Sequence, residues 1–130
     1  MEETLIAYLL ASPSLVALIG DRLTPGVRTQ GALLPALVFN LVSDLPDYSN
    51  SGPTGLTQAR IQLDAYGATY AQAKAVARAA NARLSGWRRA VGGWAIHGVF
   101  QQNAHDTFTN DAPEKIHGVS TDFIVWANAA

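Results

Sequence analysis

The chain has 130 residues, 48% of them hydrophobic, which suits one domain that buries roughly two thirds of the surface its unfolded form exposes. Nine basic and ten acidic side chains give a formal net charge of -1, so no strong field attracts the protein to nucleic acid or to anionic membranes. The chain has no cysteine, which excludes disulfides and thiol chemistry and fits a reducing compartment.

The first twenty residues predict two short helices. Apolar residues recur at helical spacing from about Glu2 to Ala11. Ser12 is placed as an N-cap with Pro13 at the first position of a second helix, which ends at Gly20. No basic segment precedes the hydrophobic part and no apolar run reaches the ~18 residues of a membrane span, so we expect neither a secretory signal nor a membrane helix.

The middle of the chain predicts two strands separated by a loop. Residues 36–45 form an extended run between prolines, and residues 46–55, "PDYSNSGPTG", collect turn-forming residues that indicate a long mobile loop. The strand that follows alternates strictly, because successive side chains of a strand point to opposite faces. Its apolar face carries Ile61, Leu63 and Ala65, and its polar face carries Arg60, Gln62 and Asp64.

The second half of the chain predicts one helix and two more strands. Thr69 and Gln72 form a capping box before an alanine-rich helix from Tyr70 to about Leu84, which should lie flat on a sheet. Gly92 and Gly93 indicate a tight hairpin turn. A strand over residues 94–102, a polar loop over 103–115 and a last strand over 116–127 follow. We therefore predict a single α+β domain, residues 1–130, with a mostly antiparallel or mixed sheet of about four main strands and helices packed on it.

The sequence contains no recognisable catalytic or metal-binding cluster. His97, His105 and His117 are far apart, and a meeting of His97 and His117 across strands would still lack further ligands. No nucleophile elbow or phosphate-binding loop is present. We predict no cofactor, no metal and no enzymatic activity. A basic stripe leaves nucleic-acid binding as a weaker alternative; it comprises Lys74, Arg78, Arg88 and Arg89.

The second face of the predicted sheet combines polar and large apolar side chains. It is too polar for a core and too apolar for permanent exposure, which indicates a covering partner. The alternative is that the N-terminal helices cover it. The residues assigned to this face are Val38, Asn40, Val42, Arg60, Gln62, Asp64, His97, Val99, Ser120, Asp122, Ile124 and Trp126.

Four segments resemble the tail-completion, or tail-terminator, proteins of long-tailed, siphovirus-like bacteriophages and gene transfer agents. They are "LLASPSLVALIGDRLTP", "LPALVFNLVS", "GLTQARIQLDAYGATYAQAKAVARAANARL" and "GVSTDFIVWA". The third is the most specific, with its alternating polar strand, Tyr66 and the capped helix that begins at Thr69 and Tyr70. None of these segments is a catalytic motif.

The resemblance implies a structural subunit of a closed, hexameric ring at the head-proximal end of the tail tube. Such a ring ends tube polymerisation, docks the head connector or stopper protein, and lets DNA pass without specific binding. The resemblance also implies that the ring is assembled in the bacterial cytoplasm and becomes part of the virion. The implied subunit interface comprises Arg60, Gln62, Asp64, Asp122, Ile124 and Trp126, and the candidate loops for tube or connector contain Asp47, Tyr48, Asn50, His105, Asp106 and Asp111.

A second hypothesis is a small oligomeric enzyme or ligand-binding domain. It would use the second face of the sheet as a pocket, with His97, Asp122 and Trp126 near the site. A bound metal or small molecule would favour this alternative over the ring.

Overall fold

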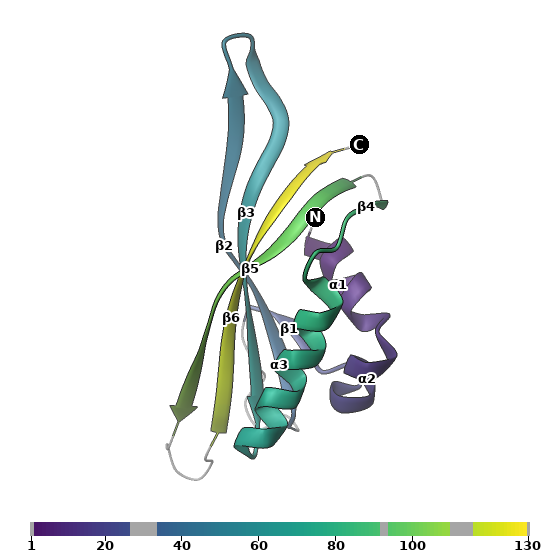
Figure 1. Cartoon of the computed structure of the whole chain (residues 1–130), viewed down its shortest axis with the longest axis vertical. Coiled ribbons are helices and arrows are strands. Elements are labelled where there is room, and N and C mark those ends of the chain that lie inside the picture. Colours follow the sequence, from purple (N-terminus) through teal and green to yellow (C-terminus); the bar gives the residue numbers. More distant parts are fainter. Residues whose placement is uncertain (1, 27–33, 92–93, 110–115, 130) are drawn as a thin grey trace.

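The computed structural model describes residues 2–26, 34–91, 94–109 and 116–129. In these residues, three helices pack against one six-stranded sheet with the strand order β1-β2-β3-β6-β5-β4 (Figure 1). The elements are α1 (Glu2–Leu10), α2 (Pro13–Ile19), β1 (Leu23–Pro25), β2 (Ala36–Ser49), β3 (Gly52–Gly67), α3 (Tyr70–Leu84), β4 (Arg89–Val91), β5 (Trp94–Thr109) and β6 (Ile116–Ala129). The predicted α+β class is confirmed.

Four long antiparallel strands, β2, β3, β6 and β5, make up most of the sheet. Two strands of three residues lie at its edges, β1 parallel to β2 and β4 antiparallel to β5. The sequence does not predict β1, because three residues are too few to show alternation. Val91 pairs with Trp94 across the predicted glycine turn, whose residues 92–93 lie outside the described residues.

Capping side chains define the starts of α2 and α3, as the sequence predicts. Ser12 accepts a hydrogen bond from the backbone N–H of Leu15 at 3.4 Å. Thr69 accepts one from the backbone N–H of Gln72 at 3.1 Å, and the Gln72 side chain accepts one from the N–H of Ala68 at 2.7 Å. The second bond of this capping box therefore forms one residue before the cap.

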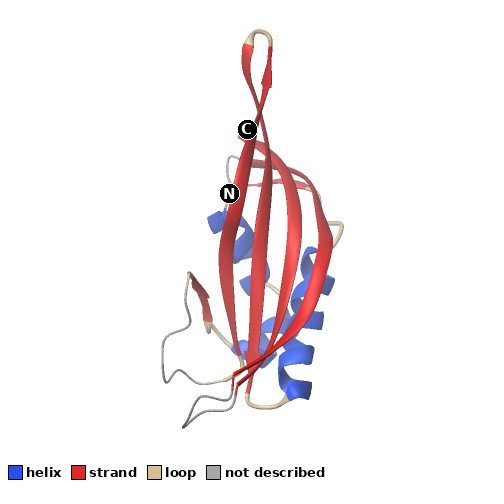
Figure 2. Ribbon diagram, turned by 90° about the vertical axis from the view of Figure 1, so that its left-hand side faces the viewer, coloured by secondary structure: helices blue, strands red, loops and turns tan. Residues whose placement is uncertain are grey.

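The core lies between the helices and one face of the sheet (Figure 2). Helices α1, α2 and α3 all cover this face, so the alternative in which the N-terminal helices cover the second face is wrong. The principal buried side chains are Leu5, Leu9, Leu15 and Ile19 from α1 and α2; Ala59, Ile61, Leu63 and Ala65 from β3; Ala73, Val76, Ala80 and Leu84 from α3; and Val99, Phe123 and Val125 from β5 and β6.

Gly67 ends β3 against the first turn of α3. A Cβ atom at this position would lie 2.6 Å from the backbone nitrogen of Ala73, which moves only if the helix moves. We expect Gly67→Ala to lower the free energy of unfolding by about 2 kcal/mol, as overpacking does, in urea denaturation.

Gly98→Ala is the matched control for this substitution. Its Cβ atom would come equally close, 2.7 Å, to the ring of Phe100. That side chain is 55% exposed and can rotate away, so the control should lose little stability. Equal losses in the two variants would contradict the packing explanation.

Candidate functional site

The six residues predicted as a subunit interface lie on one face of β3 and β6. The register pairs Arg60 with Ile124, Gln62 with Asp122, and Gln58 with Trp126. Paired residues of antiparallel strands point to the same side, and within the described residues no helix covers that side (Figure 2). We call this surface the open face. Arg60, Gln62, Asp64, Asp122, Ile124 and Trp126 are all partly exposed on it, and their role as an interface stays a prediction.

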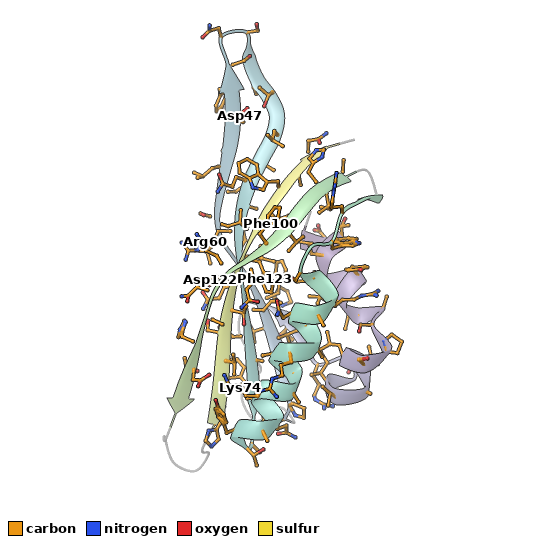
Figure 3. All side chains as sticks on the ribbon, viewed as in Figure 1. Asp47, Arg60, Lys74, Phe100, Asp122 and Phe123 are labelled. Atoms are coloured by element: carbon orange, nitrogen blue, oxygen red, sulfur yellow. The ribbon has the colours of Figure 1, made fainter. Side chains whose placement is uncertain are left out.

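The polar part of the open face is a hydrogen-bonded network within the chain. Arg60 Nη2 lies 2.8 Å from Asp122 Oδ2 in an ion pair (Figure 3). Asp64 accepts hydrogen bonds from Ser120 Oγ at 2.7 Å and from Gln62 Nε2 at 3.1 Å, and Gln62 also donates to Ser120. These charges are therefore partly compensated across β3 and β6, and the network fixes the register of the two strands.

An apolar belt crosses the open face beside this network. We define it as Leu45, Phe100, Ile124 and Trp126, one residue or more from each of β2, β5 and β6. Ile124 pairs directly with Phe100, while Leu45 and Trp126 flank Gln58 in one row of the sheet. Leu45 is 60% exposed and Phe100 is 55% exposed. Such a group of large apolar side chains on one surface is typical of an interaction site.

Phe100 is absent from the sequence prediction, which places Val99 on this face instead. Val99 is fully buried in the core. The reason is a register shift between Ile96 and Gly98, because one extra residue in a strand reverses the alternation that follows. Gly98, a glycine inside a strand pattern, is the signal that indicates such a bulge.

Residues 41–56 form a hairpin, which we call the arm, and its outer part projects beyond the rest of the sheet as a two-stranded ribbon (Figure 1). Residues 41–46 pair with residues 57–61 of β3, which also pair with β6, whereas beyond them Tyr48 and Ser49 pair with Pro53 and Gly52, where the described chain adds no third strand. The prediction of a mobile loop over 46–55 is wrong: Asp47 and Tyr48 lie on β2, and only the turn at Asn50 remains. A hydrogen bond of 2.9 Å from Thr54 Oγ1 to Asp47 Oδ2 joins the two strands.

The opposite end of the sheet carries His105 and Asp106. The predicted loop over 103–115 is wrong at both positions, because β5 continues to Thr109 in pairing with β6. Asp111 lies outside the described residues. Lys74 Nζ of α3 lies 2.7 Å from Asp106 Oδ1, and Tyr70 donates to Asp106 Oδ2 at 3.2 Å.

The contact between Lys74 and Asp106 changes the pKa of both groups. Its hydrogen bond lowers the pKa of Asp106 and raises the pKa of Lys74. The side chain of Asp106 is 50% exposed and that of Lys74 is 28% exposed, so solvent screening keeps the contribution of this ion pair to stability small. The pair attaches the start of α3 to β5. It also neutralises Lys74, one of the four basic residues named for the alternative of nucleic-acid binding.

His97, Asp122 and Trp126, the residues named for the alternative of an enzyme or ligand-binding domain, do not gather around a common pocket. His97 contacts Asn128, and Asp122 is paired with Arg60. His117 pairs with Gly67 at the other end of β6. His97 and His117 therefore lie at opposite ends of the β5–β6 pair and do not meet. A pocket of about 140 Å³ lies on the helix side, between α3 and β5. No three metal-ligating side chains gather anywhere in the described ranges.

Membrane-spanning helices are also absent from the part of the chain that the structure covers. None of its helices combines the length and the apolar character that a bilayer crossing requires.

Comparison with known proteins places this geometry in a family. The chain matches the family model described as Tail completion protein gp17 over residues 3–128. It also shares its fold with a chain of the structure described as "Virion of native gene transfer agent (GTA) particle", with a TM-score of 0.80, 16% identity, and coverage of 96% of this chain and 92% of that chain. No curated protein matches the sequence. Because the family match spans almost the whole chain, the protein belongs to the Tail completion protein gp17 family and has a structural role in a phage-type tail.

Proposed function

We propose that this chain forms a closed hexameric ring at the head-proximal end of a tail tube. The ring ends polymerisation of the tube protein and provides the surface on which the head connector docks. Membership of the tail completion family supports the location in the tail. The main observation in favour of self-assembly is the apolar belt, because no described helix covers it on the open face. We propose a structural rather than a catalytic role.

The open face is the proposed contact between neighbouring copies. A ring requires heterologous interfaces, in which one patch meets a different patch on the next copy. The apolar belt supplies the area that gains most from exclusion of water. The charged network beside it, which contains Arg60, Asp64 and Asp122, orients the contact through electrostatic complementarity. Gln62, Ile124 and Trp126 complete the proposed interface.

The two ends of the long sheet are the proposed contacts with other tail components. The turn at Asn50 ends the arm, and His105 and Asp106 lie toward the opposite end. A ring between a tube and a connector needs two axial surfaces, and these ends supply one each. DNA would pass through the central channel without specific binding, which the net charge of -1 accommodates.

Light scattering and a tube-capping assay test this function together. We expect a mass of six copies at high protein concentration or in the presence of tube ends, and an arrest of tube growth when the protein is added to polymerising tube protein. A strictly monomeric protein that also leaves tube growth unchanged would contradict the proposal. A metal or small molecule retained in native mass spectrometry would favour the enzyme alternative.

A further inference from the structure

The arm has the exposed, charged surface of a segment that docks on a partner. Leu41, Val42, Leu45 and Tyr48 are 40%, 51%, 60% and 67% exposed. A two-stranded ribbon is marginally stable without further packing. Residues 41–56 include two aspartates and no basic residue. Asp44 accepts from Thr57 and Asp47 from Thr54, and neither forms an ion pair with another described residue.

The pocket between α3 and β5 has complementary properties. Its volume of about 140 Å³ is close to the ~150 Å³ that accommodates a benzene ring. Asn81 Oδ1 is buried at this pocket and has no hydrogen-bond partner in the described structure, so it is an acceptor that a donor would satisfy. The lining residues are Lys74, Ala77, Arg78, Asn81, Gln101, Ala104, Val119 and Thr121.

We propose that Tyr48 of one copy enters this pocket on the next copy of the ring, where its hydroxyl donates to Asn81 Oδ1. The inference rests on the proposed ring and specifies one of its contacts. Tyr48 is the most exposed large apolar side chain of the described residues, and it carries an O–H donor. Asp47 then approaches Arg78, which is exposed and forms no ion pair with another described residue. This assigns Asp47 and Tyr48 to the neighbouring copy and leaves Asn50 for an axial partner.

The edge of the arm favours side-chain docking over strand pairing. Pro46 has no backbone N–H to donate, and the register shifts between Pro46 and Tyr48. Proline and bulges are the features that keep edge strands from adding to other sheets. The arm therefore presents side chains, chiefly Tyr48, rather than a continuous row of backbone groups.

The distance along the sheet is compatible with neighbouring copies in a ring. Tyr48 pairs with Pro53, whereas the pocket residue Thr121 pairs with Leu63, ten residues further along β3. That separation corresponds to about 33 Å. In closed barrels the strands tilt by about 35–45° from the axis. With the same tilt in a ring of these copies, the width of six neighbouring strands displaces the next copy along the strand direction by roughly 20–30 Å. The two distances are similar, so the pocket of the next copy comes close to the level of the arm.

Cross-linking of full-length variants tests the contact directly, because the chain contains no cysteine. Tyr48→Cys and Ala77→Cys proteins are mixed under ring-forming conditions and treated with a short bismaleimide reagent. We expect linked heterodimers, and a ladder up to the closed ring when one chain carries both substitutions. Asn50→Cys at the tip of the arm is the matched control and should give no link to Ala77→Cys.

Ring stability provides a second readout. Tyr48→Phe, which removes only the hydroxyl, should weaken association of the copies about tenfold. Tyr48→Ala should weaken it about a hundredfold, with unchanged circular dichroism. If the wild-type protein forms rings but the cysteine variants give no link and both Tyr48 substitutions leave ring stability unchanged, this inference is overturned and the proposed ring stands. Cross-links from the arm to tube protein would have the same consequence. Absence of rings from the wild-type protein, both at high concentration and in the presence of tube ends, overturns this inference and the proposed ring together.

Discussion

Replacing Trp126 with alanine should prevent ring assembly while the monomer stays folded. Trp126 belongs to the apolar belt of the open face and is partly exposed in the isolated chain, so its removal leaves no cavity in the core. Tryptophan at the centre of an interface contributes about 2–4 kcal/mol when truncated, which corresponds to roughly 30- to 1000-fold weaker association. Light scattering over a concentration series measures this loss, and circular dichroism verifies the fold.

Val16→Ala is the control for the Trp126 substitution. Val16 is also an exposed apolar residue, at 37%, but it lies on α2, on the helix side of the sheet. This variant should assemble as the wild type does. If Trp126→Ala assembled equally well, the subunit contact would lie elsewhere than on the open face. Reversal of Asp64 is a less specific test, because this carboxylate also accepts hydrogen bonds from Ser120 and Gln62 within the chain.

Local patterns in the sequence were sufficient for the elements that contact the core. Alternation along β3 predicts the buried positions Ile61 and Leu63 and the open-face positions Arg60 and Asp64, and the structure places all four as expected. The cap at Thr69 likewise predicts the start of α3. These features depend on side-chain period and on hydrogen bonds between residues close in sequence.

The two segments predicted as loops depend on longer-range pairing. Residues 46–55 contain prolines, glycines and an asparagine, so their composition indicates a loop. Pairing between β2 and β3 nevertheless extends to Ser49 and Gly52. Residues 103–109 lack an alternating pattern because this part of β5 is largely exposed, and its conformation follows from pairing with β6. A single sequence carries no direct signal of these partners.

Bulges limit prediction of the open face in a similar way. The register shifts on β2 between Leu41 and Ser43 and on β5 between Ile96 and Gly98. Each shift reverses which residues face the core. The assignments on β3 and β6, whose mutual register is uninterrupted, were therefore correct, whereas Val99 on β5 was assigned to the wrong face.

Phe123→Ala should unfold the protein far more readily than any open-face substitution. Phe123 lies three residues from Trp126 on β6 but on the opposite face, where it is fully buried and pairs with Ile61 (Figure 3). Truncation of a buried phenylalanine costs about 3–5 kcal/mol through lost burial and the cavity that remains. A domain of this size has about 5–15 kcal/mol of total stability, so the urea midpoint should fall strongly.

The comparison of Phe123→Ala with Trp126→Ala separates folding from assembly on a single strand. Phe123→Leu, which refills most of the cavity, should recover the greater part of the lost stability. Trp126→Ala should retain the wild-type urea midpoint and lose the ring, because its side chain gains its full burial only from a partner. If the two alanine variants lost equal stability, Trp126 would already be packed within its own chain. The open face would then have no unsatisfied apolar surface to drive a ring.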